Sequence, residues 1–160
     1  MADIGKYSKS IEEKLVEKWE EEELYKFVDD GSKKPYVIDS PPPFTSGKLH
    51  MGHILSYTMF DIDARYRRMS GYAVLYAQGW DTQGFPTEVK VEAKYGRLPR
   101  EEFIRKCKEW TQEHIESMRK QAKRFAFSSD WSREYITMEP SYHYKVQKSL
   151  VDMYKGGDIY

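Results

Sequence analysis

Two short β-prone runs enclose one helical segment in the first half of the chain, and this order constrains the fold more than any other feature. The first run, residues 36–39, stops at three consecutive prolines, and the second, residues 72–76, is apolar apart from its tyrosine hydroxyls. Between them, apolar residues recur at helical spacing over residues 50–71. Strand, turn, helix and strand make one β-α-β unit with a right-handed crossover. We therefore expect an α/β fold with a parallel sheet.

This unit sets further expectations about its elements. The helix after the prolines should end at Gly71 and bury an apolar stripe made up of Leu55, Thr58, Met59, Ile62, Tyr66 and Met69. A helix of roughly 25 residues should follow from about Pro99, a third short strand is expected at residues 135–138, and Pro140 suits the start of a last helix. So small a parallel sheet rarely stands alone, and the fold therefore looks incomplete.

Composition excludes several classes of function. Lysine and arginine balance aspartate and glutamate at 26 each, which removes the simplest argument for nucleic-acid binding, a strongly basic domain. There is no apolar run of about 18 residues, so no membrane partner is expected. Cys107 is the only cysteine, so neither an internal disulfide nor a cysteine-rich zinc site can form. These features favour a cytoplasmic protein.

The segment that carries chemistry is the run from Pro41 to His53, PPPFTSGKLHMGH. Here a strand should end, a turn should follow, and a helix should begin with His50 and His53 on one face. The N-terminus of a helix presents free N–H groups and a partial positive charge, which suit phosphate. Gly52 would let a ligand approach the backbone closely. A zinc site is a weaker reading because no cysteine or third acidic partner lies nearby, and we expect no metal ligands.

This run resembles the signature of class I aminoacyl-tRNA synthetases that ends in His-x-Gly-His, in the form typical of valyl members. Two more segments agree: GWDTQGFPTEVKVE at residues 79–92, and SDWSREY at residues 129–135, which resembles the segment before the inserted editing domain. The resemblance implies the first half of a Rossmann-like nucleotide-binding fold with long flanking helices, left incomplete. It divides the chain into an N-terminal helical segment, 1–35, and a catalytic part, 36–160, that ends before the editing insertion.

The reaction that this resemblance implies is ATP-dependent activation of valine, with Mg²⁺, and transfer of the product to tRNA(Val). Its implied catalytic residues are His50, His53 and Thr45. The implied ATP contacts are Pro43, Phe44, Thr45, Gly47, His50, Gly52 and His53. Asp81 would hold the ammonium group of the amino acid, and Pro41 and Pro42 would line its side chain.

The sequence also departs from the family pattern. The second phosphate-binding motif, Lys-Met-Ser-Lys-Ser, is absent, as are the editing insertion and the second half of the nucleotide-binding fold. We therefore expect a fragment, a truncated reading frame or one part of a split enzyme whose C-terminal half would be a partner. Alternatives are an isoleucyl-type enzyme, which the three prolines disfavour, and a nucleotide-binding module without catalysis. Small nucleotidylyltransferases also carry His-x-Gly-His, but the segment 79–81 has no place in them.

Overall fold

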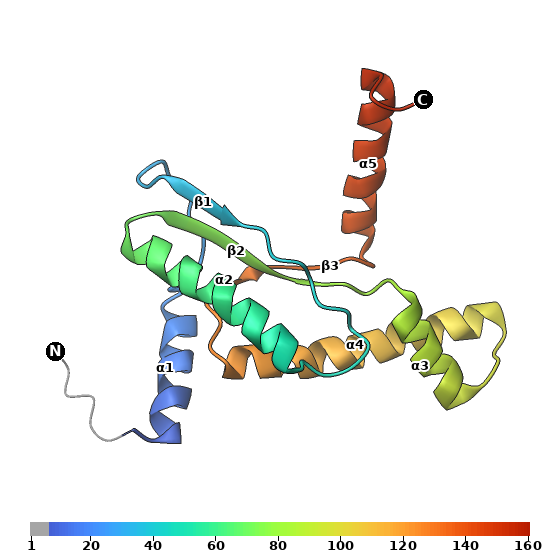
Figure 1. Ribbon diagram of the computed structural model, residues 1–160, viewed down its shortest axis with the longest axis horizontal. Coiled ribbons are helices and arrows are strands. Elements are labelled where there is room, and N and C mark those ends of the chain that lie inside the picture. The colour runs from blue at the N-terminus through green and yellow to red at the C-terminus, as the bar shows by residue number, and fades with distance from the viewer. Residues whose placement is uncertain (1–6) are drawn as a thin grey trace.

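The structure, a computed structural model, describes residues 7–160 and has an α/β architecture (Figure 1). Residues 1–6 of the expected N-terminal segment lie outside the described part. The elements in chain order are α1 (Lys9–Glu21), β1 (Pro35–Ile38), α2 (Met51–Met69), β2 (Ala73–Trp80), α3 (Phe85–Tyr95), α4 (Arg100–Arg124), β3 (Asp130–Ile136) and α5 (Pro140–Gly156). The predicted fold class, the β1-α2-β2 unit and the long fourth helix are confirmed.

The three strands form one parallel sheet in the order β1-β2-β3. The β1–β2 pairing runs from Pro35 opposite Ala73 to Ile38 opposite Tyr76. On the other side of β2, Ala77 lies opposite Asp130 and Gly79 opposite Tyr135, with a shift of register between them. All three strands therefore direct their carboxyl ends to the same edge of the sheet, where loops gather.

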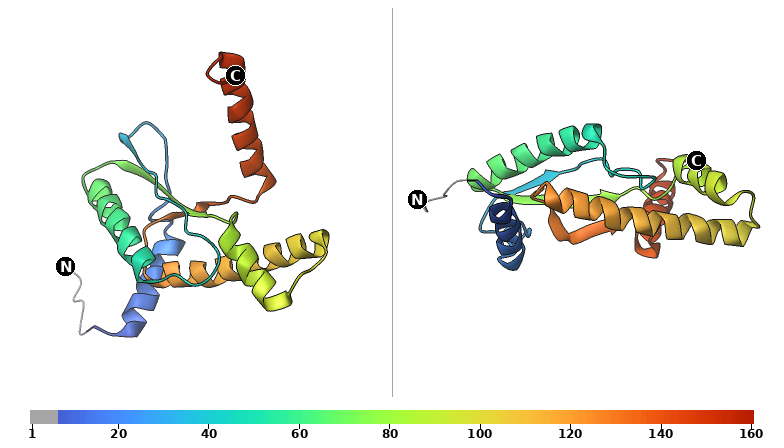
Figure 2. Two further views of the ribbon diagram at one scale, coloured as in Figure 1. Left: turned by 45° about the vertical axis from the view of Figure 1, so that its right-hand side comes forward. Right: turned by 90° about the horizontal axis from the view of Figure 1, so that it is seen from below.

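One face of this sheet carries the hydrophobic core. Alternate residues of β2 point to that face, because successive side chains of a strand alternate between its two sides. Val74 and Tyr76 pack with Ala64 of α2, while Trp80 packs with Ile115 and Met118 of α4. Figures 1 and 2 show α2 and α4 on the same side of the sheet. The two helices therefore share the strand, with α2 over its beginning and α4 over its end.

The predicted apolar stripe of α2 is wrong. All six of its members are exposed, and the buried residues of the helix are Tyr57, Asp61 and Ala64. The buried set lies at i, i+4 and i+7 and includes a carboxylate, so a search for apolar periodicity could not select it. Asp61 belongs there because its Oδ1 accepts the Ser128 N–H and its Oδ2 accepts the Arg65 Nε–H at 2.7 Å.

Two strand boundaries and one helix also differ from expectation. The third strand begins at Asp130 rather than at residue 135, and β2 runs on to Trp80, well beyond residue 76. Helix α3 was not predicted at all. It begins after Gly84, with a proline in its first turn, and ends at Tyr95 before its C-cap Gly96, whose φ of 73° suits glycine. Its tertiary contacts are with α4, and this packing stabilises a helix too short to be stable alone.

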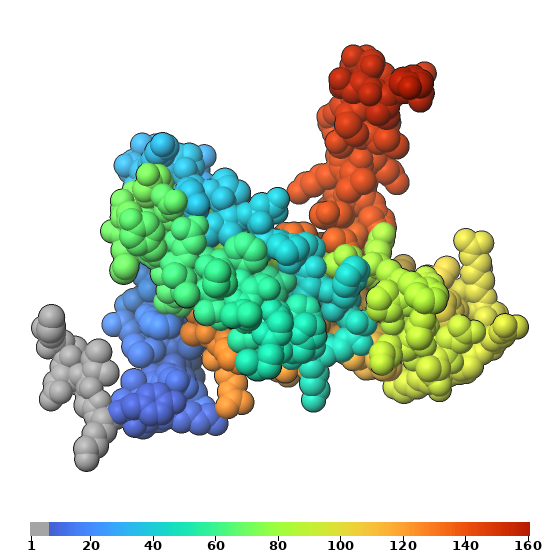
Figure 3. Space-filling view, viewed as in Figure 1, coloured from blue at the N-terminus to red at the C-terminus, as the bar shows by residue number. Residues whose placement is uncertain are grey.

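The N-terminal segment is attached to the rest through polar contacts. Lys123 of α4 forms a 2.8 Å ion pair with Glu20, and Asp130 accepts the N–H of Phe27 at 2.9 Å. The Arg65 guanidinium donates to the Tyr25 hydroxyl at 2.9 Å. At the other end, α5 has no buried residue and projects away from the body (Figure 3). Among residues 7–160, no helix is both long and apolar enough to cross a bilayer.

Candidate functional site

The loop after β1 and the end of β2 meet at the carboxyl edge of the sheet. The Asp81 N–H donates to the Pro43 carbonyl at 2.9 Å, and the Thr45 N–H donates to the Asp81 carbonyl at 3.0 Å. Phe44 and Asp81 thus form an isolated parallel bridge beyond the last residue of β1. Two segments that were noted separately in the sequence are therefore joined by backbone hydrogen bonds into one site.

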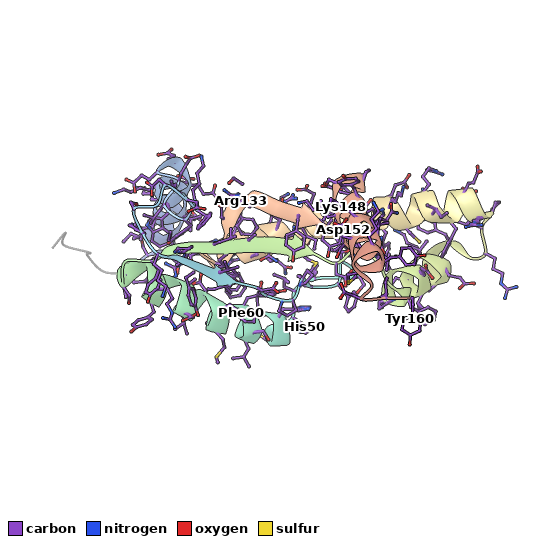
Figure 4. All side chains as sticks on the ribbon, turned by 90° about the horizontal axis from the view of Figure 1, so that it is seen from above. His50, Phe60, Arg133, Lys148, Asp152 and Tyr160 are labelled. Atoms are coloured by element: carbon purple, nitrogen blue, oxygen red, sulfur yellow. The ribbon has the colours of Figure 1, made fainter. Side chains whose placement is uncertain are left out.

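His50 and His53 cap the N-terminus of α2, each side chain accepting a hydrogen bond from the backbone N–H of the other. His50 is the N-cap residue, and its Nδ1 accepts the N–H groups of Gly52 at 3.1 Å and His53 at 3.4 Å. In return, Nδ1 of His53 accepts the N–H of His50 at 3.3 Å. The two histidines form a capping box, a role usually taken by a hydroxyl and a carboxyl or amide side chain. Figure 4 places His50 at this end of the helix, beside the loop that follows β1.

This capping arrangement determines which ring nitrogens are free. In a neutral imidazole one nitrogen carries a hydrogen and the other accepts. Because Nδ1 accepts in both residues, the neutral rings carry their hydrogens on Nε2. The rings stack with centroids 3.8 Å apart and planes 25° apart. The pair therefore presents two Nε2–H donors side by side at a helix N-terminus.

The pKa of His53 supports a neutral ring at this position. Burial of the ring lowers this pKa, and the neighbouring His50 lowers it further. Near neutral pH His53 is accordingly uncharged, which avoids placing two positive charges in stacked rings. Gly52 completes the arrangement, since a Cβ atom there would lie 3.0 Å from Cε1 of His50 and crowd the capping ring.

Asp81 is held through one of its two carboxylate oxygens. Its Oδ1 accepts the N–H of Gln83 at 3.1 Å and the hydroxyl of Thr137 at 3.4 Å. Within residues 7–160, its Oδ2 has no hydrogen-bond partner. The Asp81 side chain is half-buried, so this second oxygen can accept donors from a ligand at the edge of the sheet.

The other residues expected in the site fall into two groups. Pro41, Phe44 and Gly47 lie at the surface or partly so, and the Pro41 carbonyl already accepts the Tyr57 hydroxyl at 2.7 Å. Burial, followed by the nearby Tyr76, raises the pKa of Tyr57, which therefore remains a hydrogen-bond donor. By contrast, Pro43 and Thr45 are buried. The Thr45 hydroxyl donates to the Asp81 carbonyl at 3.1 Å.

Sequence reasoning missed several residues that organise this edge. Thr82 and Thr137 form a buried pair beside Asp81, and Tyr135 covers Gly79. Gln83 contacts His143, the two Nε2 atoms being 2.7 Å apart, and this links the loop to the first turn of α5. Thr82 and Gln83 lie inside the family-like segment at residues 79–92, so their position in that segment could have indicated a role. For Thr137 no local signal existed, because its role depends on the pairing of β2 with β3.

The site is an open edge and not an enclosed cavity. Three hollows in the described part lie elsewhere: one of about 680 Å³ beside Tyr25 and Arg68, one of about 450 Å³ along α5 beside Lys148, and one of about 240 Å³ between α1 and the end of α4. The first and the third are bordered by the N-terminal segment. No group of three or more His, Cys, Asp or Glu within residues 7–160 is placed to hold a metal ion. Ligands that reach His50 and Asp81 would therefore contact this chain from one side.

The sequence model of the family described as tRNA synthetases class I (I, L, M and V) matches residues 14–160, which is nearly the whole chain. The chain belongs to the class I tRNA synthetase family. Within that family it is 50% identical to a valine–tRNA ligase of Methanocaldococcus jannaschii over 158 residues, or 96% of this chain. A valine–tRNA ligase of Pyrococcus furiosus is 53% identical over 152 residues, or 94% of this chain.

A solved class I synthetase has the same fold. The structure is a ternary complex of Agrobacterium radiobacter K84 LeuRS with tRNA and LeuAMS, and it superposes with a TM-score of 0.75 at 32% identity over 93% of this chain. The match spans only part of each relative: 18% of the Methanocaldococcus jannaschii ligase, 17% of the Pyrococcus furiosus ligase and 18% of LeuRS. The chain therefore matches one part, 17–18% of the length, of these larger synthetases.

Proposed function

We propose that this chain provides the His-x-Gly-His part of an ATP site in an enzyme that activates valine as valyl-adenylate and transfers it to tRNA(Val). The observation that carries the proposal is the paired geometry at one sheet edge. At the N-terminus of α2, two stacked imidazoles use Nδ1 for capping and leave Nε2 available as a donor, and the free oxygen of Asp81 stands on the adjoining loop. Donors for phosphate and an acceptor for an ammonium group are the two requirements of amino acid activation.

The proposed reaction does not require these residues to transfer a proton. The amino acid carboxylate is already an anion at neutral pH, so it can attack the α-phosphate of ATP without a general base, and pyrophosphate leaves. Negative charge spreads over the phosphate oxygens in the transition state. Preorganised donors at His50 and His53 would stabilise that charge, and the loss of one such donor typically costs about 3–4 kcal/mol of transition-state stabilisation.

The amino acid would be held at the other end of the same edge. The Oδ2 atom of Asp81 would accept from the α-ammonium group, and the carbonyl of Pro41 has a second lone pair available beside the Tyr57 hydroxyl. Pro42 would form a rigid wall for a small aliphatic side chain. Thr45 would support the site by joining its two loops, because its buried hydroxyl donates to the Asp81 carbonyl.

The partners follow from the proposed reaction. Mg²⁺ would reach the site with the triphosphate, whose oxygens are its preferred ligands, because the described residues offer no carboxylate cluster for it. Valine is favoured over isoleucine by the two valine–tRNA ligases at about half identity. The tRNA and the second phosphate-binding motif would be supplied by other parts of the enzyme, in one chain or in a C-terminal partner polypeptide. We propose that this activity takes place in the cytoplasm, where it would serve protein synthesis.

Exchange of pyrophosphate into ATP tests the proposal directly. It would be measured with valine, isoleucine and leucine for the chain alone, for the chain mixed with a polypeptide carrying the rest of the Methanocaldococcus jannaschii ligase, and for a hybrid in which this chain replaces the matching segment of that ligase. We expect valine-dependent exchange by the hybrid. If the hybrid is inactive while the unaltered ligase is active, or prefers isoleucine, the proposal is wrong.

A further inference from the structure

We infer that Thr137 is a positioning residue that orients the Asp81 carboxylate toward the amino acid, an inference that rests on the function proposed for Asp81. Thr137 follows β3 directly, and its N–H donates to the Trp80 carbonyl at 3.1 Å. This bond continues the parallel pairing one step beyond the strands, so that Thr137 stands opposite Asp81. Paired residues of a sheet project to the same face, which brings the hydroxyl and the carboxylate together.

The hydrogen bonds of the Thr137 hydroxyl fix which of its neighbours it accepts from and which it donates to. A hydroxyl donates once and accepts through two lone pairs. Oγ1 of Thr137 accepts the Thr82 N–H at 2.9 Å and lies 3.0 Å from Oγ1 of Thr82. Its single hydrogen can reach Oδ1 of Asp81 at 3.4 Å only if Thr82 supplies the hydrogen between the two hydroxyls. The order of donation is therefore Thr82 to Thr137 to Asp81.

Because the two hydroxyls are buried, water cannot easily take their place in these hydrogen bonds. Thr82 and Thr137 are each only 9% exposed. With the N–H of Gln83 as a second donor, Oδ1 of Asp81 has both partners it needs, and the carboxylate cannot turn about its last bond without losing them. Its Oδ2 is left without a hydrogen-bond partner among residues 7–160. An ammonium group, which carries only donors, is the ligand that this oxygen suits.

The test compares Thr137→Val, which keeps the shape and removes the hydroxyl, with Thr137→Ser, which keeps the hydroxyl. In the hybrid ligase, we expect Thr137→Val to raise the KM for valine about tenfold, as expected for one modest hydrogen bond to a charged group. The KM for ATP and the exchange rate at saturating valine should change less than about twofold. Thr137→Ser should restore the KM for valine, which a merely structural role of the methyl group would not predict.

Two results would overturn the inference. One is an unchanged KM for valine in Thr137→Val while Asp81→Asn raises it, which leaves the proposed function intact. The other comes from crystal structures of the chain with and without Thr137→Val, a measurement that needs no activity. We expect Asp81 to adopt more than one orientation in the variant, and a single unchanged orientation there contradicts the positioning role. An inactive hybrid would instead count against the proposed function, and the crystallographic comparison would still decide the inference.

Discussion

Tyr135 of β3 lies directly over Gly79 of β2, so close that a Cβ atom at position 79 would stand 2.2 Å from Cζ of the tyrosine ring. The two residues are paired in the sheet. The same ring stacks on Tyr142, the centroids being 5.9 Å apart and the planes 4° apart. Tyr135 thus connects the strand that leads into Asp81 with the first turn of α5, and only glycine leaves room for it.

Gly79→Ala should therefore destabilise the fold by about 1–3 kcal/mol, the usual cost of inserting one carbon into a packed site. Urea unfolding of the chain would measure this. Tyr135→Ala should remove the conflict, so the double variant should be more stable than additivity of the two single variants predicts. Tyr135→Phe should not, because the clash is with the ring itself. Additive effects in the Gly79→Ala, Tyr135→Ala pair would contradict the packing described.

The pKa of His53 makes stability depend on pH. Burial and His50 lower this pKa in the folded chain, whereas the unfolded chain takes up a proton near the ordinary histidine value of about 6.5. In that window the unfolded state binds more protons, so the free energy of unfolding should fall as the pH falls from about 7 to 5.5. His53→Gln keeps an acceptor for the His50 N–H and should reduce this slope. Identical slopes in the two proteins would refute the shift.

Substitutions in the exposed apolar stripe of α2 should have little effect on stability, whereas helical periodicity alone would predict a large loss. Ile62 is exposed, so Ile62→Gln should change the free energy of unfolding by no more than about 0.5 kcal/mol. Tyr57 is buried on the opposite side, and Tyr57→Ala should cost about 3–5 kcal/mol. Thermal or urea unfolding of the two variants compares faces of one helix. A large loss for Ile62→Gln would mean that something covers this stripe in solution.

Asp61 is the buried carboxylate of α2, and it accepts hydrogen bonds from Arg65 and Ser128. Asp61→Asn removes the charge opposite Arg65 while keeping an acceptor for the Ser128 N–H, and we expect a loss of about 2 kcal/mol. Asp63 provides the matched control on the same helix. It is more exposed and pairs with Arg67 at 3.3 Å, so Asp63→Asn should cost less than about 1 kcal/mol. Equal losses in unfolding experiments would show that burial of Asp61 does not matter.

Variants at the phosphate end and at the amino acid end of the proposed site should affect different kinetic constants. In the hybrid ligase, His53→Ala should lower the pyrophosphate exchange rate about 100- to 1000-fold, as for loss of one transition-state donor. Asp81→Ala should raise the KM for valine much more than the KM for ATP. Circular dichroism of each variant controls for folding. Equal effects of Asp81→Ala on both substrates would contradict its assignment to the ammonium group.

The sequence by itself determined the features that depend on neighbours along the chain. The turn and helix start at residues 41–53 were predicted because prolines, glycines and the histidine spacing act over a few residues. Periodicity likewise predicted α4 and the β1-α2-β2 order. The family was also evident from the sequence, since the motif from Pro41 to His53 and the segment beginning at Gly79 are contiguous.

Only the tertiary structure decided which groups face each other. The hydroxyl of Thr45 turns inward because backbone bonds join its loop to Asp81, 36 residues away. Thr137 reaches the same carboxylate from 56 residues away through the register of β2 and β3. α2 buries Asp61 and exposes Ile62 because Arg65 and Ser128 complete the hydrogen bonds of that carboxylate. These pairings arise only when the folded sheet brings distant residues together, so they cannot be predicted from the local pattern of polar and apolar residues.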